Sequence, residues 1–89
     1  MNGRRVFKYP IHDATLRGDF PAGSVPRHFG MQHGTTTLWI EVTDALVAKR
    51  RTFCIFGTGH EIPDGAVYVG TCMDREFVWH LYEVTDGRS

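Results

Sequence analysis

Three strand-like runs in the second half of the chain constrain its fold more than any other feature. Residues 52–57, 66–72 and 76–84 are rich in aromatic and β-branched side chains, which favour strands. Glycine, proline or a short polar turn separates each run from the next. Because neighbouring strands joined by short turns pair side by side, we expect a mostly antiparallel sheet.

The first half of the chain predicts three more strands. Residues 4–9 are expected to form one, ending at Pro10, and residues 24–32 an edge strand, because Pro26 lacks a ladder donor. In residues 36–43 apolar and polar positions alternate, which is typical of a half-buried strand. Residues 11–23 are interpreted as turns, and residues 44–51 as a connection with room for one helical turn at 45–48.

These elements predict an all-β protein of five to six strands with no convincing helix. A sheet this small buries its apolar face either by curling into a barrel or by folding into a sandwich. We expect a small, mostly antiparallel, partly open barrel or curled sheet. Residues 1–84 form the single β domain in this prediction, and residues 85–89 a flexible C-terminal tail.

The size of the chain limits its stability. A chain of 89 residues buries only roughly 60% of the surface that it exposes when unfolded. A homodimer would therefore help, and an edge strand near Pro26 could support one, although proline also blunts strand addition at that edge.

The charge of the chain is balanced. Lys and Arg number 10, as do Asp and Glu, which argues against a binder that neutralises nucleic-acid phosphates. Lys49, Arg50 and Arg51 are the one candidate basic patch, with a solvated turn as the alternative. No apolar run reaches the roughly 20 residues that span a bilayer, and no signal-type apolar core follows the N-terminus. We expect a cytoplasmic protein without a membrane partner.

The two cysteines, Cys54 and Cys72, both fall inside predicted strands. In a reducing compartment such residues behave as small, buried apolar side chains. We expect two free thiols. The sequence leaves open whether they are neighbours across the sheet.

The candidate binding loop follows the strand at residues 52–57. Two glycines around a threonine can turn backbone amides toward one point, which suits a phosphate or carboxylate ligand. A histidine then adds a donor whose charge changes near neutral pH. A structural turn is the alternative for these residues, which are Gly57, Thr58, Gly59 and His60.

His80 raises the question of catalysis or metal binding. It shares a strand face with Val78 and Tyr82, where it is either a packed histidine or a partner of His60 or Glu61. The ligand spacing fits no known metal site. We expect no metal, no cofactor and no enzyme activity, and a metal-dependent hydrolase using His60 and His80 remains a weaker alternative. His12, His28 and His33 are expected at the surface.

Trp39 lies on the more polar face of its predicted strand, beside Thr37 and Glu41. An exposed tryptophan commonly marks an interface, whereas a covered one belongs to the core. Both interpretations stay open.

The chain resembles a family of small, uncharacterised proteins of tailed bacteriophages and prophages. The likeness spans most of the chain, and Pro26 and Gly30 are departures from the regular alternation expected there. The stretches that carry it are Val6-Phe7-Lys8-Tyr9-Pro10, Leu38-Trp39, Arg51-Thr52-Phe53, Gly57-Thr58-Gly59-His60-Glu61-Ile62-Pro63, Tyr68-Val69-Gly70-Thr71 and Phe77-Val78-Trp79-His80.

The resemblance implies a phage accessory protein that acts in the host cytoplasm by binding. We expect an inhibitor of a bacterial defence system such as CRISPR–Cas, which contacts a host defence protein or complex. Trp39 would anchor that contact, with Lys49, Arg50 and Arg51 at its rim. The alternative is a module that binds a nucleotide-like or other phosphorylated ligand through residues 57–60.

Overall fold

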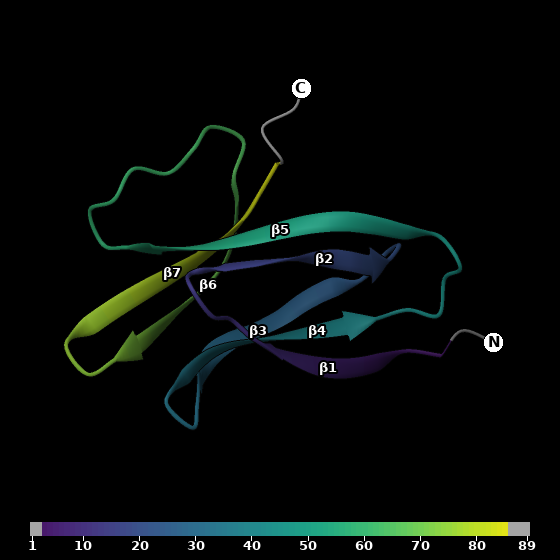
Figure 1. The fold of residues 1–89 in the computed structure, drawn as a ribbon, viewed down its shortest axis with the longest axis horizontal. Helices are drawn as coiled ribbons and strands as arrows, with labels where there is room; N and C mark the ends of the chain where they lie inside the picture. The colour runs from purple at the N-terminus through teal and green to yellow at the C-terminus, as the bar shows by residue number, and fades with distance from the viewer. Residues whose placement is uncertain (1–2, 86–89) are drawn as a thin grey trace.

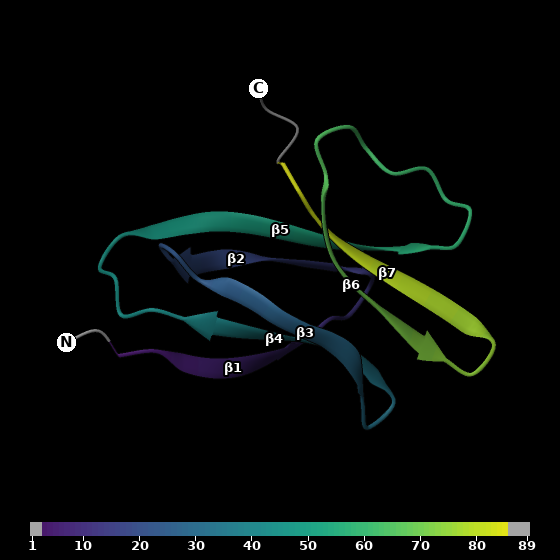
Figure 2. The same cartoon turned by 180° about the vertical axis from the view of Figure 1, so that it is seen from behind.

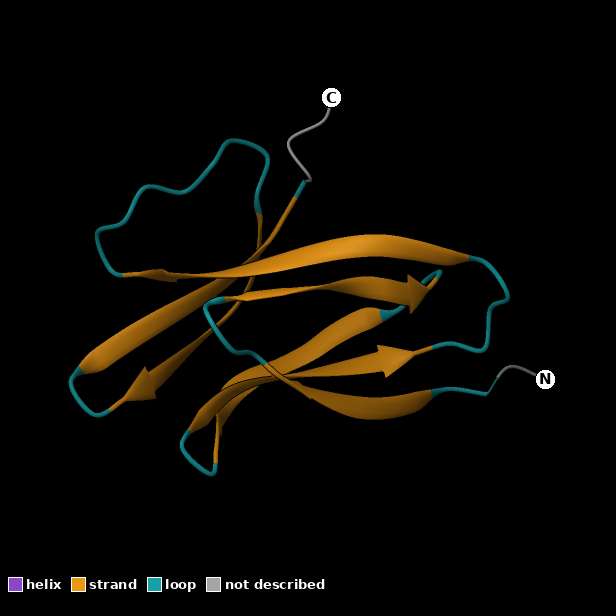
Figure 3. Cartoon of the chain, in the orientation of Figure 1, coloured by secondary structure: helices purple, strands orange, loops and turns teal. Residues whose placement is uncertain are grey.

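Seven strands and their connections make up the computed structural model, which describes residues 3–85 (Figure 3). Within this range there is no helix, so the predicted all-β class is confirmed. Residues 86–89, most of the predicted tail, lie outside the described residues. The strands are β1 (Arg5–Pro10), β2 (Thr15–Pro21), β3 (Val25–Gln32), β4 (Thr35–Val42), β5 (Ala48–Gly57), β6 (Val67–Asp74) and β7 (Phe77–Val84).

The strands form two antiparallel sheets that are not closed into one barrel. Sheet A has the order β1-β4-β3, and sheet B the order β2-β5-β7-β6 (Figure 1). The chain changes sheet after β1, β2 and β4, whereas β3–β4 and β6–β7 are hairpins within one sheet. Both views show these two hairpins projecting at the same end of the domain (Figure 2).

The core lies between the two sheets and follows the alternation of their strands. Leu38, Ile40 and Val42 of β4 are buried, as the pattern predicts. From sheet B, Phe53 and Leu81 meet them and are fully buried. The core extends toward β2 through aromatic contacts. Phe20 of β2 contacts both Tyr9 of β1 and Phe53 in T-shaped geometry.

The two sheets approach most closely where β3 passes β6. A side chain at Gly70 would place its Cβ only 3.2 Å from the Cβ of Phe29. Glycine therefore allows this approach, and β6 covers part of the edge that β3 presents in sheet A. The predicted edge position of the strand containing Pro26 is confirmed, and the register shifts between Pro26 and His28.

Two predictions for the connections were wrong. Residues 15–21, interpreted as turns, form β2, which pairs with β5 along its whole length. Residues 45–48 hold no helical turn, because β5 begins at Ala48 and the preceding residues are an exposed connection. The number of strands is therefore seven instead of five to six.

Candidate functional site

The predicted binding loop is a tight turn at the end of β5. The amide of His60 donates to the carbonyl of Gly57 over 3.1 Å, which closes a four-residue β-turn. Gly59 has a positive φ of 93°, a conformation that glycine adopts without strain. The sequence pattern therefore predicted the position of the turn. It also indicated why the turn contains glycine, since Gly59 adopts a positive φ.

The polar groups of this turn are bonded to the protein itself. The Nδ1 atom of His60 accepts from the amide of Gly57 at 3.1 Å, and its ring covers that glycine. Thr58 Oγ1 lies 2.9 Å from Nε2 of His80 on β7. Two of the four backbone amides and both polar side chains therefore already have partners, which favours a structural role.

Replacing His60 with alanine tests this role. Loss of the bond to Gly57 should lower the free energy of unfolding by about 1 kcal/mol, since water can solvate the freed amide. Denaturant unfolding measures the change, and His12→Ala, at another exposed histidine, should stay within about 0.5 kcal/mol of the parent. Unchanged stability, together with lost binding of inorganic phosphate by NMR titration, would identify the loop as a ligand site instead.

A chain of hydrogen bonds runs from His80 along the outer surface of sheet B. Its Nδ1 atom lies 3.0 Å from Thr71 Oγ1, which in turn lies 2.6 Å from the hydroxyl of Tyr68. With Thr58 on its Nε2 atom, the imidazole has a partner at each nitrogen. Among the described residues, His80 makes these hydrogen bonds with Thr58 and Thr71, and not with His60 or Glu61 as the alternative interpretation proposed.

On the outer surface of sheet B, aromatic and apolar side chains from three strands lie side by side, some of them exposed and the others half-buried. Tyr82 contacts Phe56 and Tyr68 edge to face, at centroid distances of 5.9 and 5.5 Å. Tyr68 is 55% exposed, and Met73 is 72% exposed. We call this cluster the aromatic face, and it comprises Phe56, Tyr68, Met73, Val78, His80 and Tyr82.

The three cations of the predicted basic patch do not form one surface. Because β5 begins at Ala48, successive side chains alternate between the two faces of sheet B. Arg50 points outward and lies 3.7 Å from Asp19 in an exposed ion pair. Lys49 is exposed near the start of β5, and Arg51 points toward sheet A.

Arg51 joins sheet B to the connection before β3 at one end of the core. Its guanidinium donates twice to the carboxylate of Glu83, with both bonds 2.7 Å long, and also to the carbonyl of Ser24. Hydrogen bonding to the carboxylate of Glu83 raises the pKa of Arg51, and burial opposes this in part. The residue predicted at a binding rim therefore has a structural role.

Trp39 lies on the outer face of sheet A and is half-buried. Its ring packs against the imidazole of His28 at 5.3 Å. On the same face Glu41 pairs with Arg4 and Arg27. This surface is more polar than the aromatic face of sheet B, where Tyr68 is more exposed than Trp39.

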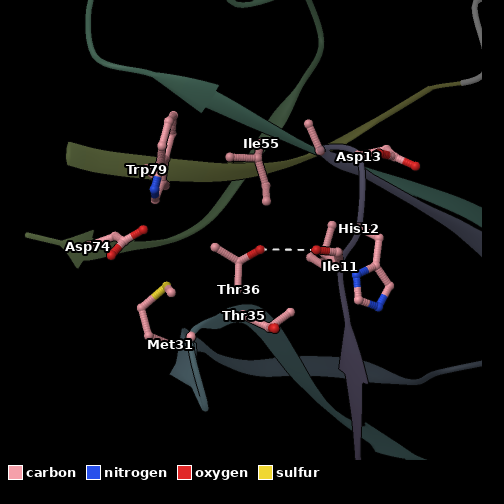
Figure 4. A pocket seen from close by; sticks show the side chains of 11 residues that line it. Ile11, His12, Asp13, Met31, Thr35, Thr36, Ile55, Asp74 and Trp79 are labelled. Atoms are coloured by element: carbon pink, nitrogen blue, oxygen red, sulfur yellow. Dashed lines mark hydrogen bonds between the residues drawn. The ribbon is translucent and has the colours of Figure 1, made fainter.

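A pocket of about 420 Å³ opens at the end of the domain where the two hairpins project. Trp79 and Asp74 lie on one side of it with Met31 beneath them, and Ile55 and Thr36 lie across from them (Figure 4). We call it the end pocket. No local pattern in the sequence indicates it, because its lining comes from two connections and five strands that meet only in the folded domain.

Both cysteines are free, as predicted, but only Cys72 is buried. Cys54 is half-buried because it faces outward on β5, and β7 lies between the two strands that carry the thiols. Burial, and then the negative charge of Asp74, raises the pKa of Cys72. A buried thiol with a raised pKa is a poor nucleophile.

This difference predicts selective alkylation and a dependence of stability on pH. Iodoacetamide should modify Cys54 faster than Cys72, as measured by mass spectrometry of the native protein. Equal alkylation of both thiols would contradict the burial of Cys72.

The raised pKa of Cys72 also makes stability depend on pH. Because the folded state keeps the Cys72 proton where the unfolded state loses it, the free energy of unfolding should fall as pH rises above about 8.5. The difference in free energy of unfolding between the parent and Cys72→Ala should therefore narrow over that pH range.

In the part of the chain that the structure describes, no three His, Cys, Asp or Glu side chains gather in a way that could hold a metal ion. None of its elements is a helix that could cross a membrane.

Fold and surface together define a small all-β domain of two facing sheets with one aromatic outer face. The chain belongs to the family DUF7352, a domain of unknown function, whose model matches residues 2–89. No curated protein and no solved structure matches the chain.

Proposed function

We propose that this protein acts by binding another protein through the aromatic face of sheet B. The phage resemblance of the sequence suggests the partner, which is a component of a bacterial defence system such as CRISPR–Cas. In this proposal the protein inhibits that component by contact and carries out no reaction of its own.

The observation that carries the proposal is the construction of the aromatic face. Tyrosine and methionine are enriched at protein interfaces, and tyrosine is frequent among the residues that contribute most binding energy. Here Tyr82 is held between Phe56 and Tyr68, and the hydroxyl of Tyr68 is held by Thr71. Side chains that are already ordered lose little conformational entropy on binding, so this face is prepared for contact.

The charge of the aromatic face also favours a protein partner. Its six side chains include no carboxylate, no lysine and no arginine. A surface that bound nucleic acid would need several cations beside its aromatic rings. The ligand-binding alternative at residues 57–60 has weaker support, because the amides of Gly57 and His60 are already bonded.

Affinity capture with matched variants tests the proposal. The parent protein, the double variant Tyr68→Asp with Met73→Asp, and the control Val6→Asp are each used to capture partners from host cells. Val6 is as exposed as Tyr68, at 55%, but lies on sheet A. A defence component that the parent and the control retain, and that the double variant loses, must then bind the purified protein directly.

The expected loss of affinity in the double variant is at least about tenfold, since charges would be buried in an apolar contact. Circular dichroism must show that all three proteins are folded. Equal capture by the parent and the double variant would overturn the proposal. A bound nucleotide in native mass spectrometry of the purified protein would support the ligand-binding alternative.

A further inference from the structure

The chemistry of the end pocket favours a positive charge. Its walls combine the indole of Trp79, the thioether of Met31 and the alkyl side chain of Ile55 with the carboxylate of Asp74. Within the described residues its lining includes neither lysine nor arginine. An aromatic ring beside a carboxylate attracts a cation by two independent electrostatic effects.

Trp79 is fixed in place and keeps one side available. Phe77 stacks on it with a centroid distance of 5.6 Å and an interplanar angle of 13°. Phe77 and Trp79 both line a second hollow beside the loop at residues 57–60, whereas only Trp79 of the pair also lines the end pocket. The indole therefore separates the two hollows, and Figure 4 shows it nearly edge-on at the wall of the pocket.

Asp74 has no cationic partner within the described part of the chain. No ion pair involves it, and the neighbouring Arg75 is exposed and does not pair with it. Asp13, on the far side of the pocket, points away from Trp79 in Figure 4. The half-buried carboxylate of Asp74 is therefore the group of this pocket that can pair with a cation bound beside Trp79.

We infer that the end pocket receives the cationic end of an arginine or lysine side chain from the protein partner. This inference rests on the proposed function, and the two surfaces adjoin. Met73 and Val78 of the aromatic face immediately precede Asp74 and Trp79 on the β6–β7 hairpin. A partner lying on the aromatic face could therefore extend one basic side chain over the hairpin into the pocket.

Small probes test the pocket without the partner. Nα-acetyl-arginine amide carries the cation, and Nα-acetyl-citrulline amide is its neutral counterpart of nearly the same shape. Their binding is followed by the fluorescence of Trp79 in a Trp39→Phe background, which leaves one tryptophan. If that variant does not fold, the indole N–H signal of Trp79 in the parent protein is followed by NMR.

The arginine probe should change the signal saturably, and the citrulline probe should bind at least about tenfold more weakly. Asp74→Asn should weaken the arginine probe by about tenfold, whereas Asp64→Asn, in the exposed β5–β6 connection, should not. An arginine probe that gives no saturable change, or that binds no better than citrulline or equally well to Asp74→Asn, would overturn the inference.

These probes need no partner, so the two proposals fail separately. Lost probe binding would leave the proposed function intact. A partner that ignored the double change at Tyr68 and Met73 would overturn that function, while cation binding in the pocket would remain measurable.

Discussion

Phe53→Ala should lower the free energy of unfolding by about 4 kcal/mol, which is the typical cost of removing a buried phenylalanine ring. Phe53 is 0% exposed, and the edge of Phe20 packs against it. Because its ring belongs to sheet B and packs in the core shared with sheet A, its loss opens a cavity between the two layers. For a domain of this size, such a loss is a large part of the total stability.

Thermal and denaturant unfolding measure this effect, and Phe7→Ala is the matched control. Phe7 faces the same interior from the edge strand β1 but is 47% exposed, so its removal should cost less than about 1.5 kcal/mol. Similar losses for the two variants would mean that the core does not lie between the sheets as described.

Arg51→Ala should cost about 2 kcal/mol, the second-largest loss among the single substitutions considered. The change leaves the carboxylate of Glu83 and the carbonyl of Ser24 without their donor. Fully buried pairs cost about 3–5 kcal/mol to break, and the partial exposure of this pair lowers the expected value. Denaturant unfolding at neutral pH measures this loss.

Arg50→Ala is the control, because it removes the same charge from the adjacent position. Its contact with Asp19 is exposed and 3.7 Å long, so the loss should stay below about 0.5 kcal/mol. The double variant Arg51→Met with Glu83→Leu should recover most of the stability, since no charge is left unpaired. Equal losses for Arg50→Ala and Arg51→Ala would refute the structural role assigned to Arg51.

Alternation made most of the fold predictable from sequence. In β4 the buried positions Leu38, Ile40 and Val42 are those that the period of two indicates. Glycine and proline marked the ends of most strands because each restricts the backbone locally. Local sequence patterns could not distinguish a barrel from two sheets, because the difference depends on which strands pair across long connections.

The errors at β2 and at the start of β5 have one cause. Residues 15–21 contain Gly18, Asp19 and Pro21, which disfavour strands, and only pairing with β5 makes them extended. The partner of that pairing includes residues 48–51, whose charged side chains lack a strand pattern of their own. Tertiary pairing therefore overrode local propensity in both segments at once.

The candidate sites show the same limit. The turn at residues 57–60 was found from its glycines, but its bonds to His80 and within itself depend on the folded sheet. The aromatic face could have been suggested by outward positions on three strands, if the order β5-β7-β6 had been known. Tyr68 and Tyr82 meet only because β6 and β7 pair in this register.

The most direct test of the proposed function is a map of the partner's contact on this protein by amide NMR shifts in the complex. We expect the perturbed amides to cluster on β5, β6 and β7 at Phe56, at residues 68–73 and at residues 78–82. Perturbations centred on Lys8, His28 and Trp39 of sheet A, with sheet B unchanged, would contradict binding through the aromatic face.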